Sequence, residues 1–267
     1  MLAITFISAA LFQVTAPTPA ADTTATKAAL LRADRDLSRT AATNPAAFLD
    51  RLQPGAPLLL PTQPVLRRGT RDPYLERYAG RGWSFRWTPI HAVASSDGRF
   101  GCTTGTTSSQ RGTDRVPRYG RYLTCWVKQG DGSWRIAAHA RNGETPAVPF
   151  PDTTLAGAPH SAVSSSTDLE AALVADAAFA RFALDSGPAA AFAQFAANDA
   201  MLLGGRASPP RGPEEIRAVF SGFGADQRLL WNPLHGVGVG VAKGGLAFTI
   251  GLSAISTAGS GEQAPGH

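Results

Sequence analysis

The sequence predicts an α+β protein built from two related domains in tandem, each with helices followed by an antiparallel sheet. The first observation is a repeat: Trp87-Thr88-Pro89-Ile90-His91 returns as Trp231-Asn232-Pro233-Leu234-His235, and Ala33-Asp34 returns as Ala175-Asp176. The offset stays between 142 and 144 residues, which indicates two copies of one domain of about 110 residues. The second observation is that each copy changes from helical periodicity to strand alternation along its length.

The first copy, residues 25–145, begins with a helix. Leu30, Ala33, Leu37 and Thr40 recur at the spacing of one helical face, which predicts a helix over residues 23–43. Pro45 suits the first turn of a second, short helix that ends near residue 52. The remaining predicted elements are a strand at 57–61, a helix at 72–78, and strands at 82–93, 99–108, 119–129 and 133–141.

Alternation along the first long strand predicts which side chains share a face. One face holds Trp83, Phe85, Trp87, Pro89, His91 and Val93, and the other holds Ser84, Arg86 and Thr88. Asp97-Gly98 and Gly130-Asp131-Gly132 are turn sequences that join successive antiparallel strands. On the last strand, His139 is predicted to share a face with Ala137 and Arg141.

Residues 146–166 are rich in Pro, Ser, Thr, Ala and Gly and are interpreted as a linker. The second copy, residues 167–256, repeats the order with helices at 167–184 and 188–197, a strand at 201–203, a helix from 213, strands at 228–241 and 246–255, and a disordered tail at 257–267. It has no counterpart of residues 119–141, so its last strand is predicted to have an open edge. Either the first copy covers this edge, or a second chain completes it, or the second copy is a decayed remnant.

Residues 1–20 have the pattern of a signal peptide. An uncharged apolar run from Leu2 to Val14 precedes a small-residue cleavage region that ends near Ala20. The run lacks the usual preceding Lys or Arg, so a disordered apolar leader or a misplaced start codon is the alternative. The pattern predicts a bacterial periplasmic or secreted protein without a membrane span.

The charge differs between the two halves of the chain. Residues 1–150 hold 19 Lys and Arg against 10 Asp and Glu, whereas residues 151–267 hold 6 against 10. Opposite net charges favour packing of one copy against the other, with a homodimer as the alternative arrangement. The basic residues form no run and no known nucleic-acid motif, so a nucleic-acid partner is not expected.

Several short motifs carry a likeness to a known family. They are Ala33-Asp34-x-x-Leu37, Leu58-Leu59-Leu60-Pro61, Arg68-Gly69, Trp87-x-Pro89, Gly101-Cys102-Thr103-Thr104-Gly105, and Tyr122-Leu123-Thr124-Cys125-Trp126 followed by Gly132-Ser133-Trp134. With these motifs the chain resembles the nuclear transport factor 2-like superfamily, in particular the SnoaL-like bacterial domains. The resemblance implies a cone, in which a bent sheet wraps over helices and leaves a hollow for a small molecule. Members include isomerases, cyclases, hydratases and non-catalytic binders, so the fold alone does not give the function.

In the steroid isomerase branch of the superfamily, the general base follows the first core strand. Here that place holds Leu60-Pro61-Thr62-Gln63 in the first copy and Leu203-Gly204-Gly205-Arg206 in the second, and neither offers a carboxylate. His91 and its repeat His235 are candidates for a base or for pocket lining, and His139 is a third. For the repeated Asp34 and Asp176, hydrogen bonding to the sheet or helix capping is the simpler reading. No catalytic residue is assigned, and neither a metal site nor a cofactor is expected from the residue spacing.

Three hypotheses follow for the interior of the cone. The first is a binding site for a small apolar or amphipathic molecule without turnover, and the second is an isomerase-like or hydratase-like enzyme with a pocket His as general base. The third is a structural module whose cone is filled by its own side chains. The candidate lining residues are Trp83, Phe85, Trp87, His91, Trp126 and His139 in the first copy, and Trp231 and His235 in the second.

Cys102 and Cys125 are the two cysteines of the chain. They lie on successive strands, and counting outward from the connecting loop near Thr113 and Asp114 places them opposite each other. Export would make oxidation feasible, so a disulfide is predicted, with two buried thiols as the alternative.

Overall fold

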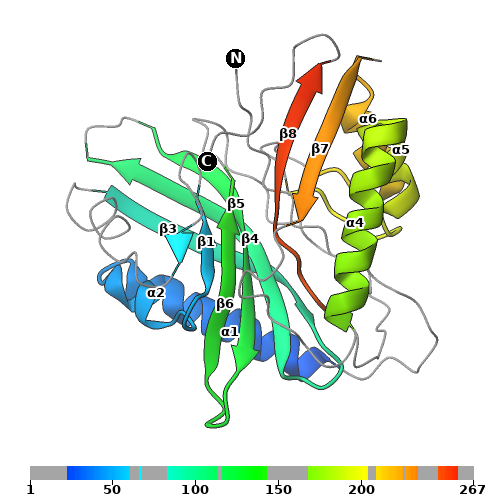
Figure 1. Ribbon diagram of the computed structural model, residues 1–267. Helices are drawn as coiled ribbons and strands as arrows, with labels where there is room; N and C mark the ends of the chain where they lie inside the picture. The colour runs from blue at the N-terminus through cyan, green and yellow to red at the C-terminus, as the bar shows by residue number, and fades with distance from the viewer. Residues whose placement is uncertain are drawn as a thin grey trace.

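A computed structural model describes residues 23–60, 66–67, 83–112, 116–142, 168–203, 209–224, 226–233 and 246–257. We call residues 23–142 the first region and residues 168–257 the second region. The elements are α1 (Thr24–Ala41), α2 (Ala46–Asp50), β1 (Pro57–Leu59), β2 (Leu66–Arg67), β3 (Trp83–Ala94), β4 (Phe100–Arg111), β5 (Arg118–Lys128), β6 (Trp134–Arg141), α4 (Asp168–Ser186), α5 (Pro188–Phe195), α6 (Gly212–Phe220), β7 (Gln227–Pro233) and β8 (Gly251–Thr257). The protein is α+β, with a curved and mostly antiparallel sheet accompanied by helices (Figure 1).

The predicted signal peptide, the linker at 146–166, the helix at 72–78 and all of the tail beyond residue 257 lie outside the described residues. Within the described ranges, none of the helices combines the length and the apolar character that a membrane crossing requires.

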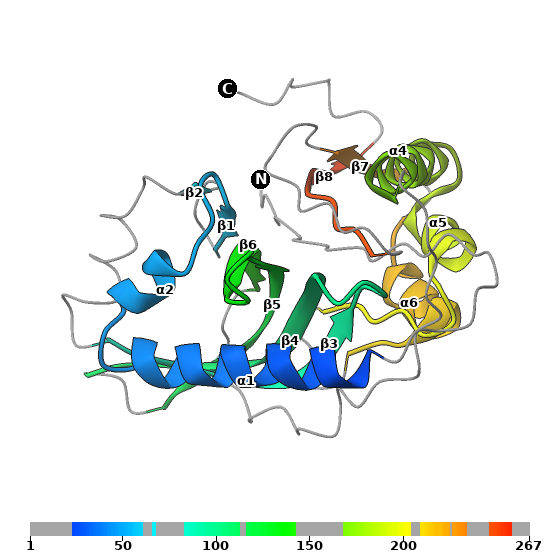
Figure 2. The ribbon, with the colours of Figure 1, turned by 90° about the horizontal axis from the view of Figure 1, so that it is seen from below.

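Helix α1 presents one continuous stripe to the sheet. Its buried residues are Leu30, Asp34, Leu37, Ser38 and Ala41, which follow the three- and four-residue spacing of a helical face. The close approach of the helix depends on a glycine in β4, because a Cβ atom added at Gly101 would lie 2.4 Å from Leu30 Cδ1. Figure 2 shows α1 running beneath the strands of the sheet.

The first region contains a six-stranded sheet in the order β2-β1-β6-β5-β4-β3. All neighbouring strands are antiparallel except β1 and β6, which are parallel. β3 lies at one edge, where the Ser38 hydroxyl of α1 donates to the carbonyl oxygen of Trp87 over 2.6 Å and accepts from its backbone N–H over 3.3 Å. The helix therefore occupies backbone groups that an edge strand would otherwise leave open.

Two irregularities in register change which side chains share a face. β3 and β4 shift between Pro89 and His91, so Trp87 pairs with Thr107 but His91 pairs with Thr104. The extra residue, Ile90, moves His91 to the opposite face from Trp87. The prediction that these two side chains share a face is therefore wrong.

A second shift, in the pairing of β5 with β6, separates Ala137 from His139. Trp126 pairs with Ile136, and Cys125 pairs with Ala138. Ala137 consequently lies in the cluster on the outer face, whereas His139 contacts Phe48 of α2 on the other face. The prediction that Ala137 and His139 share a face is wrong for the same reason.

The face of the sheet that α1 and α2 cover, which we call the helix face, carries the main core. It buries aliphatic side chains of both helices against aromatic side chains of the strands: Leu30, Leu37, Phe48, Leu49, Leu52, Leu58, Trp87, Tyr122, Trp126, Trp134 and Ile136. Burial of large side chains of this kind provides most of the stabilisation of a domain.

The opposite face, which we call the outer face, is covered by part of the second region. Leu59, Val93, Cys102, Leu123 and Cys125 form a cluster there with Phe248 and Ile250. The rings of Phe100 and Phe248 stack with their centroids 6.1 Å apart. The segment 246–250, just before β8, thus packs on the back of the first sheet.

The second region groups three helices beside a two-stranded antiparallel sheet of β7 and β8 (Figure 1). Phe179, Ala183 and Ala191 of the helices pack against Leu229 and Trp231 of β7. Helices α4, α5 and α6 agree with the predicted ones within a few residues.

The predicted strands of the second region need three corrections. The last strand begins at Gly251 rather than at 246, because only residues from Gly251 onward pair with β7. At 201–203 the structure has a single bridge between Met201 and Arg211 instead of a strand. Strand β7 covers 227–233, and residues 234–241 of the predicted strand lie outside the described residues.

The predicted disulfide is confirmed. Cys102 of β4 and Cys125 of β5 are direct partners in the sheet register and are joined through their sulfur atoms, with a Cα–Cα distance of 4.0 Å. Both residues are 1% exposed and lie on the outer face.

Candidate functional site

The helix face of the first region contains a buried carboxyl group on α1. Asp34 is 1% exposed and lies in the middle of the apolar stripe of the helix. Its Oδ1 accepts a hydrogen bond from Trp87 Nε1, and its Oδ2 accepts one from the Tyr122 hydroxyl, each over 2.7 Å. One side chain of α1 is thereby bonded to two different strands, β3 and β5.

Burial affects the protonation of both members of this pair. Removal from water raises the pKa of Asp34, and the hydrogen bonds from Thr103, Trp87 and Tyr122 oppose that effect. The pKa of Tyr122 lies well above its usual value because of burial, with the charge of Asp34 as the second cause. Tyr122 therefore keeps its proton and acts as a hydrogen-bond donor.

A second polar group lies one row further along the sheet. The Nδ1 atom of His139 lies 2.8 Å from the Thr124 hydroxyl, and its ring contacts Phe48 at 4.9 Å and Tyr122 at 6.0 Å between centroids. Burial lowers the pKa of His139 to about 3, so the imidazole is neutral at physiological pH. Beside it, Trp126 Nε1 donates to the Thr103 hydroxyl over 2.9 Å.

At the other end of the helix face, a cation from one strand lies over an aromatic ring from a strand three positions away in the sheet. Arg141 belongs to β6 and Phe85 to β3, yet the guanidinium carbon lies 4.7 Å from the centre of the Phe85 ring. The strands between them, β5 and β4, carry Gly120 and Thr107 as direct partners. The Arg141 side chain, which is 4% exposed, therefore crosses the helix face to reach β3.

The bond between an aspartate of the first helix and an indole recurs in the second region. Trp231 Nε1 donates to Asp176 Oδ1 over 2.6 Å, and Asp176 is fully buried. The two aspartates occupy matching positions in the repeat, as do the two tryptophans. For Asp34 and Asp176, hydrogen bonding to the sheet is thus what the structure shows.

The structure brings only some of the predicted lining residues together. Phe85, Trp87, Trp126 and His139 lie on the helix face, His91 lies on the outer face, and Trp231 belongs to the separate core of the second region. The side chain of Trp83 and all of His235 lie outside what is described.

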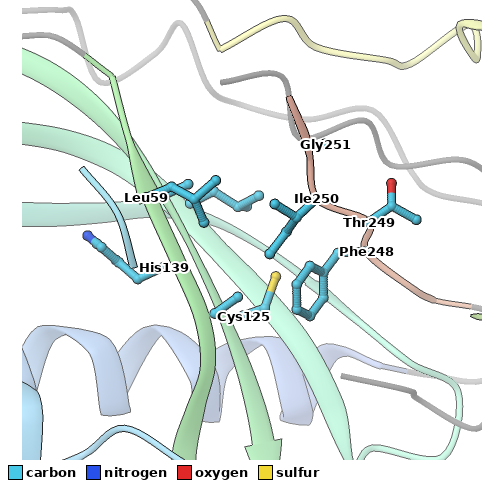
Figure 3. Close-up of a pocket in the computed structure, with 10 residues that line it drawn as sticks. Leu59, Cys125, His139, Phe248, Thr249, Ile250 and Gly251 are labelled. Carbon is cyan, nitrogen blue, oxygen red and sulfur yellow. The ribbon is translucent and has the colours of Figure 1, made fainter. Parts of the chain in front are cut away.

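A small cavity lies on the outer face, between the first sheet and the segment 246–251 (Figure 3). Its walls are mostly apolar and include Leu59, Cys125, Phe248 and Ile250. The space is about 20 Å³, which is room for roughly one water molecule. His139 of β6 is also among the residues that line the cavity, with its ring pointing away from Phe248 and Ile250 (Figure 3).

Sequence reasoning missed several residues of the helix face. Phe48, Thr124 and Arg141 had no assigned role, and Tyr122 entered only as part of a motif. Asp34 was the one sequence feature that could have pointed to them. It is a carboxyl group within an apolar helical stripe, and a buried carboxyl group requires hydrogen-bond donors nearby. The described residues contain no cluster of three or more His, Cys, Asp or Glu side chains suited to a metal ion.

No protein-family model matches the chain, and none of the curated proteins matches it. Solved structures similar to part of the chain include a ketosteroid isomerase-like protein from Erwinia carotovora atroseptica, with 20% identity, a TM-score of 0.36, and coverage of 43% of this chain and 93% of the other. A nuclear transport factor 2-like superfamily protein from Salmonella enterica has 13% identity, a TM-score of 0.38, and coverage of 46% and 94%. A nuclear transport factor 2-like protein from Cytophaga hutchinsonii has 15% identity, a TM-score of 0.34, and coverage of 43% and 96%.

Identities and TM-scores of this size say nothing about activity, ligand or partner.

Proposed function

We propose that the helix face of the first region binds a small apolar or amphipathic molecule without turning it over. The observation that carries this proposal is a continuous series of ring contacts. Phe85 contacts Trp87 at 5.6 Å, Trp87 contacts Phe48 at 5.9 Å, and Phe48 contacts His139 at 4.9 Å between centroids. Aromatic surfaces with a few polar groups are typical of small-molecule sites.

The absence of turnover is supported by the state of the groups that could transfer protons. Among the described residues, His139 is the histidine on this face, and a pKa of about 3 makes it a weak base at neutral pH. Both oxygens of Asp34 accept hydrogen bonds from Trp87 and Tyr122. These groups therefore serve to hold the site together rather than to attack a substrate.

Titration with the neutral, environment-sensitive dye Nile red, followed by displacement with 1-decanol, tests the binding proposal. We expect saturable binding that weakens about tenfold in Phe85→Ala, because part of an aromatic surface is lost. Leu230→Ala is the matched control, since Leu230 is 43% exposed on β7 of the second region. His91→Ala should also leave the affinity unchanged, because His91 lies on the outer face. A failure of the full-length protein to bind either compound would show that the helix face is filled by its own side chains.

The proposal includes an exported protein with two copies of one domain. The repeated bonds from Trp87 to Asp34 and from Trp231 to Asp176 support the duplication. The Cys102–Cys125 disulfide supports an oxidising compartment. Fractionation of expressing cells and the mass of the mature chain test export, and cleavage near Ala20 is the expected result.

For partners, the proposal favours packing of one domain against the other over a homodimer. The contact of Phe248 and Ile250 with the outer face supports this choice. Size-exclusion chromatography with light scattering should accordingly give the mass of one chain, whereas the mass of two chains would favour the homodimer.

A further inference from the structure

The disulfide of the first region is enclosed by its own sheet on all sides but one. Along one row of the sheet, Val93 of β3 is the direct partner of Cys102, and Ala138 of β6 is the direct partner of Cys125. The sheet itself separates the bridge from the helix face, because both cysteines belong to the cluster on the outer face. The open approach to the sulfur atoms is therefore from above the outer face.

The segment 246–250 occupies this approach. Phe248 and Ile250 are 4% and 6% exposed and belong to the same apolar cluster as both cysteines. Figure 3 shows the sulfur atom of Cys125 pointing towards these two side chains. Cys125 also lines the small cavity beneath the segment, so its sulfur atom is the one that a reagent entering there would meet.

The covered disulfide is out of reach of a thiol reagent. Reduction begins when a thiolate attacks one sulfur atom of the bridge, so the reagent has to contact that atom. The cavity of about 20 Å³ has room for roughly one water molecule, and any dithiol is several times larger. A thiolate would also lose its hydration among apolar walls, which carries a high free-energy cost.

We propose that the segment 246–250 is a cover that controls the reduction of the Cys102–Cys125 disulfide by external dithiols. Once the segment has left the outer face, a thiolate of the dithiol attacks the Cys125 sulfur atom, forms a mixed disulfide and releases Cys102 as a thiolate. The second thiol of the reductant then displaces Cys125. The dithiol loses two electrons and two protons and becomes a cyclic disulfide, and the cysteines take them up as thiols.

Such a cover makes the redox state of the first region depend on the docking of the second. The segment leads directly into β8, which pairs with β7, so it belongs to the body of the second region. A chain whose second region has not docked would lose its disulfide to a dithiol that the docked chain resists. The inference does not depend on the proposed binding function, because the disulfide and the helix face lie on opposite sides of the sheet.

Reduction of the oxidised full-length protein by dithiothreitol at pH 8 tests the inference. N-ethylmaleimide traps the free thiols, and the intact mass counts them over time. We expect the folded protein to be reduced roughly a hundredfold more slowly than the same protein unfolded in guanidinium chloride, because the segment has to open first. Phe248→Ala should be reduced about tenfold faster than the wild type, since it removes the largest apolar contact that holds the segment down.

Two further variants separate opening of the cover from general loss of stability. Ile250→Ala weakens the cover at a second position and should also accelerate reduction. Leu37→Ala is the matched control, because it removes a side chain that is 3% exposed from the core of the helix face and leaves the segment untouched. Its rate of reduction should equal that of the wild type. Circular dichroism of each variant establishes that it is folded.

The outcomes decide between a local cover and a passive buried bridge. Faster reduction of both cover variants with an unchanged Leu37→Ala would support the proposal. Acceleration of Leu37→Ala to the same extent would show that the sheet itself has to unfold, and would overturn it. Wild-type rates in both cover variants, or a folded wild type reduced as fast as the unfolded chain, would overturn it as well.

Discussion

The two regions hold the same pair of side chains in different surroundings. In the first region, the carboxyl group of Asp34 accepts from both Trp87 and Tyr122, and a six-stranded sheet encloses the pair. In the described part of the second region, Asp176 accepts from Trp231 beside a two-stranded sheet.

The two regions are also in direct contact. The segment before β8 places Phe248 and Ile250 against the outer face of the first sheet, so apolar surface of the second region is buried by its neighbour. The first region relies on its own strands and a disulfide. The comparison therefore predicts that equivalent substitutions will have unequal effects.

The largest difference is expected between the two aspartates. Asp34→Ala would leave two buried donors, those of Trp87 and Tyr122, without their acceptor, and should lower the free energy of unfolding by about 4 kcal/mol. Asp176→Ala removes the acceptor of Trp231 beside a two-stranded sheet and should cost less, about 2 kcal/mol. Hydrogen exchange read by mass spectrometry would locate each loss in its own region, and equal losses would contradict the comparison.

Phe248→Ala tests how far the second region depends on the first. Phe248 is 4% exposed and stacks on Phe100, so its removal should cost about 3 kcal/mol and increase exchange in β7 and β8 more than in β3 to β6. Ile255→Ala, at a position 37% exposed on β8, is the control and should have little effect. Faster exchange confined to the first region would show that the dependence runs the other way.

Replacing both cysteines with alanine tests the self-sufficiency of the first region. The bridge closes a loop with a separation of 23 residues, for which loop entropy predicts a loss of about 3 kcal/mol. The loss should concentrate in β4 and β5, while α4 to α6 keep their protection. A uniform loss across both regions would mean that they unfold as one unit.

The pH dependence that His139 adds to the first region is the smallest predicted effect when it is taken per pH unit. Its pKa is about 3 in the folded chain and about 6.5 when unfolded, so its contribution to stability is present above pH 6.5 and is lost as the pH falls towards 3. His139→Gln should remove this slope, which amounts to at most about 1.4 kcal/mol per pH unit. Asp34 has a raised pKa and contributes a slope of the opposite sign, but it is present in both proteins and cancels in their difference. Parallel pH profiles for the two proteins would show that His139 does not titrate differently on unfolding.

Local patterns in the sequence predicted the elements well where one periodicity governed them. The stripe through Leu30 and Leu37 gave α1, and counting outward from a hairpin loop paired Cys102 with Cys125. Both inferences depend on residues that are near each other along the chain or are related by a single turn. Such relations can be read from spacing alone.

The errors arose where a strand departs from its period of two. The extra residue Ile90 reverses the facing of every later side chain in β3, and its local mark is the preceding Pro89, which fits either a bulge or an edge strand. The contact between Asp34 and Tyr122 joins positions 88 residues apart, so it depends on the whole sheet being in place. A site of this kind could not be assembled from the sequence, although its carboxyl group could be located.

The attachment of Phe248 and Ile250 to the outer face has a consequence for behaviour in solution. The segment that carries Phe248 and Ile250 and the outer face that it covers belong to one polypeptide. Their association is therefore intramolecular and does not weaken on dilution. Another protein molecule could bind the outer face only by displacing the segment 246–250, which is covalently linked to that face through the chain. The covered outer face is therefore protected from non-specific self-association at any protein concentration.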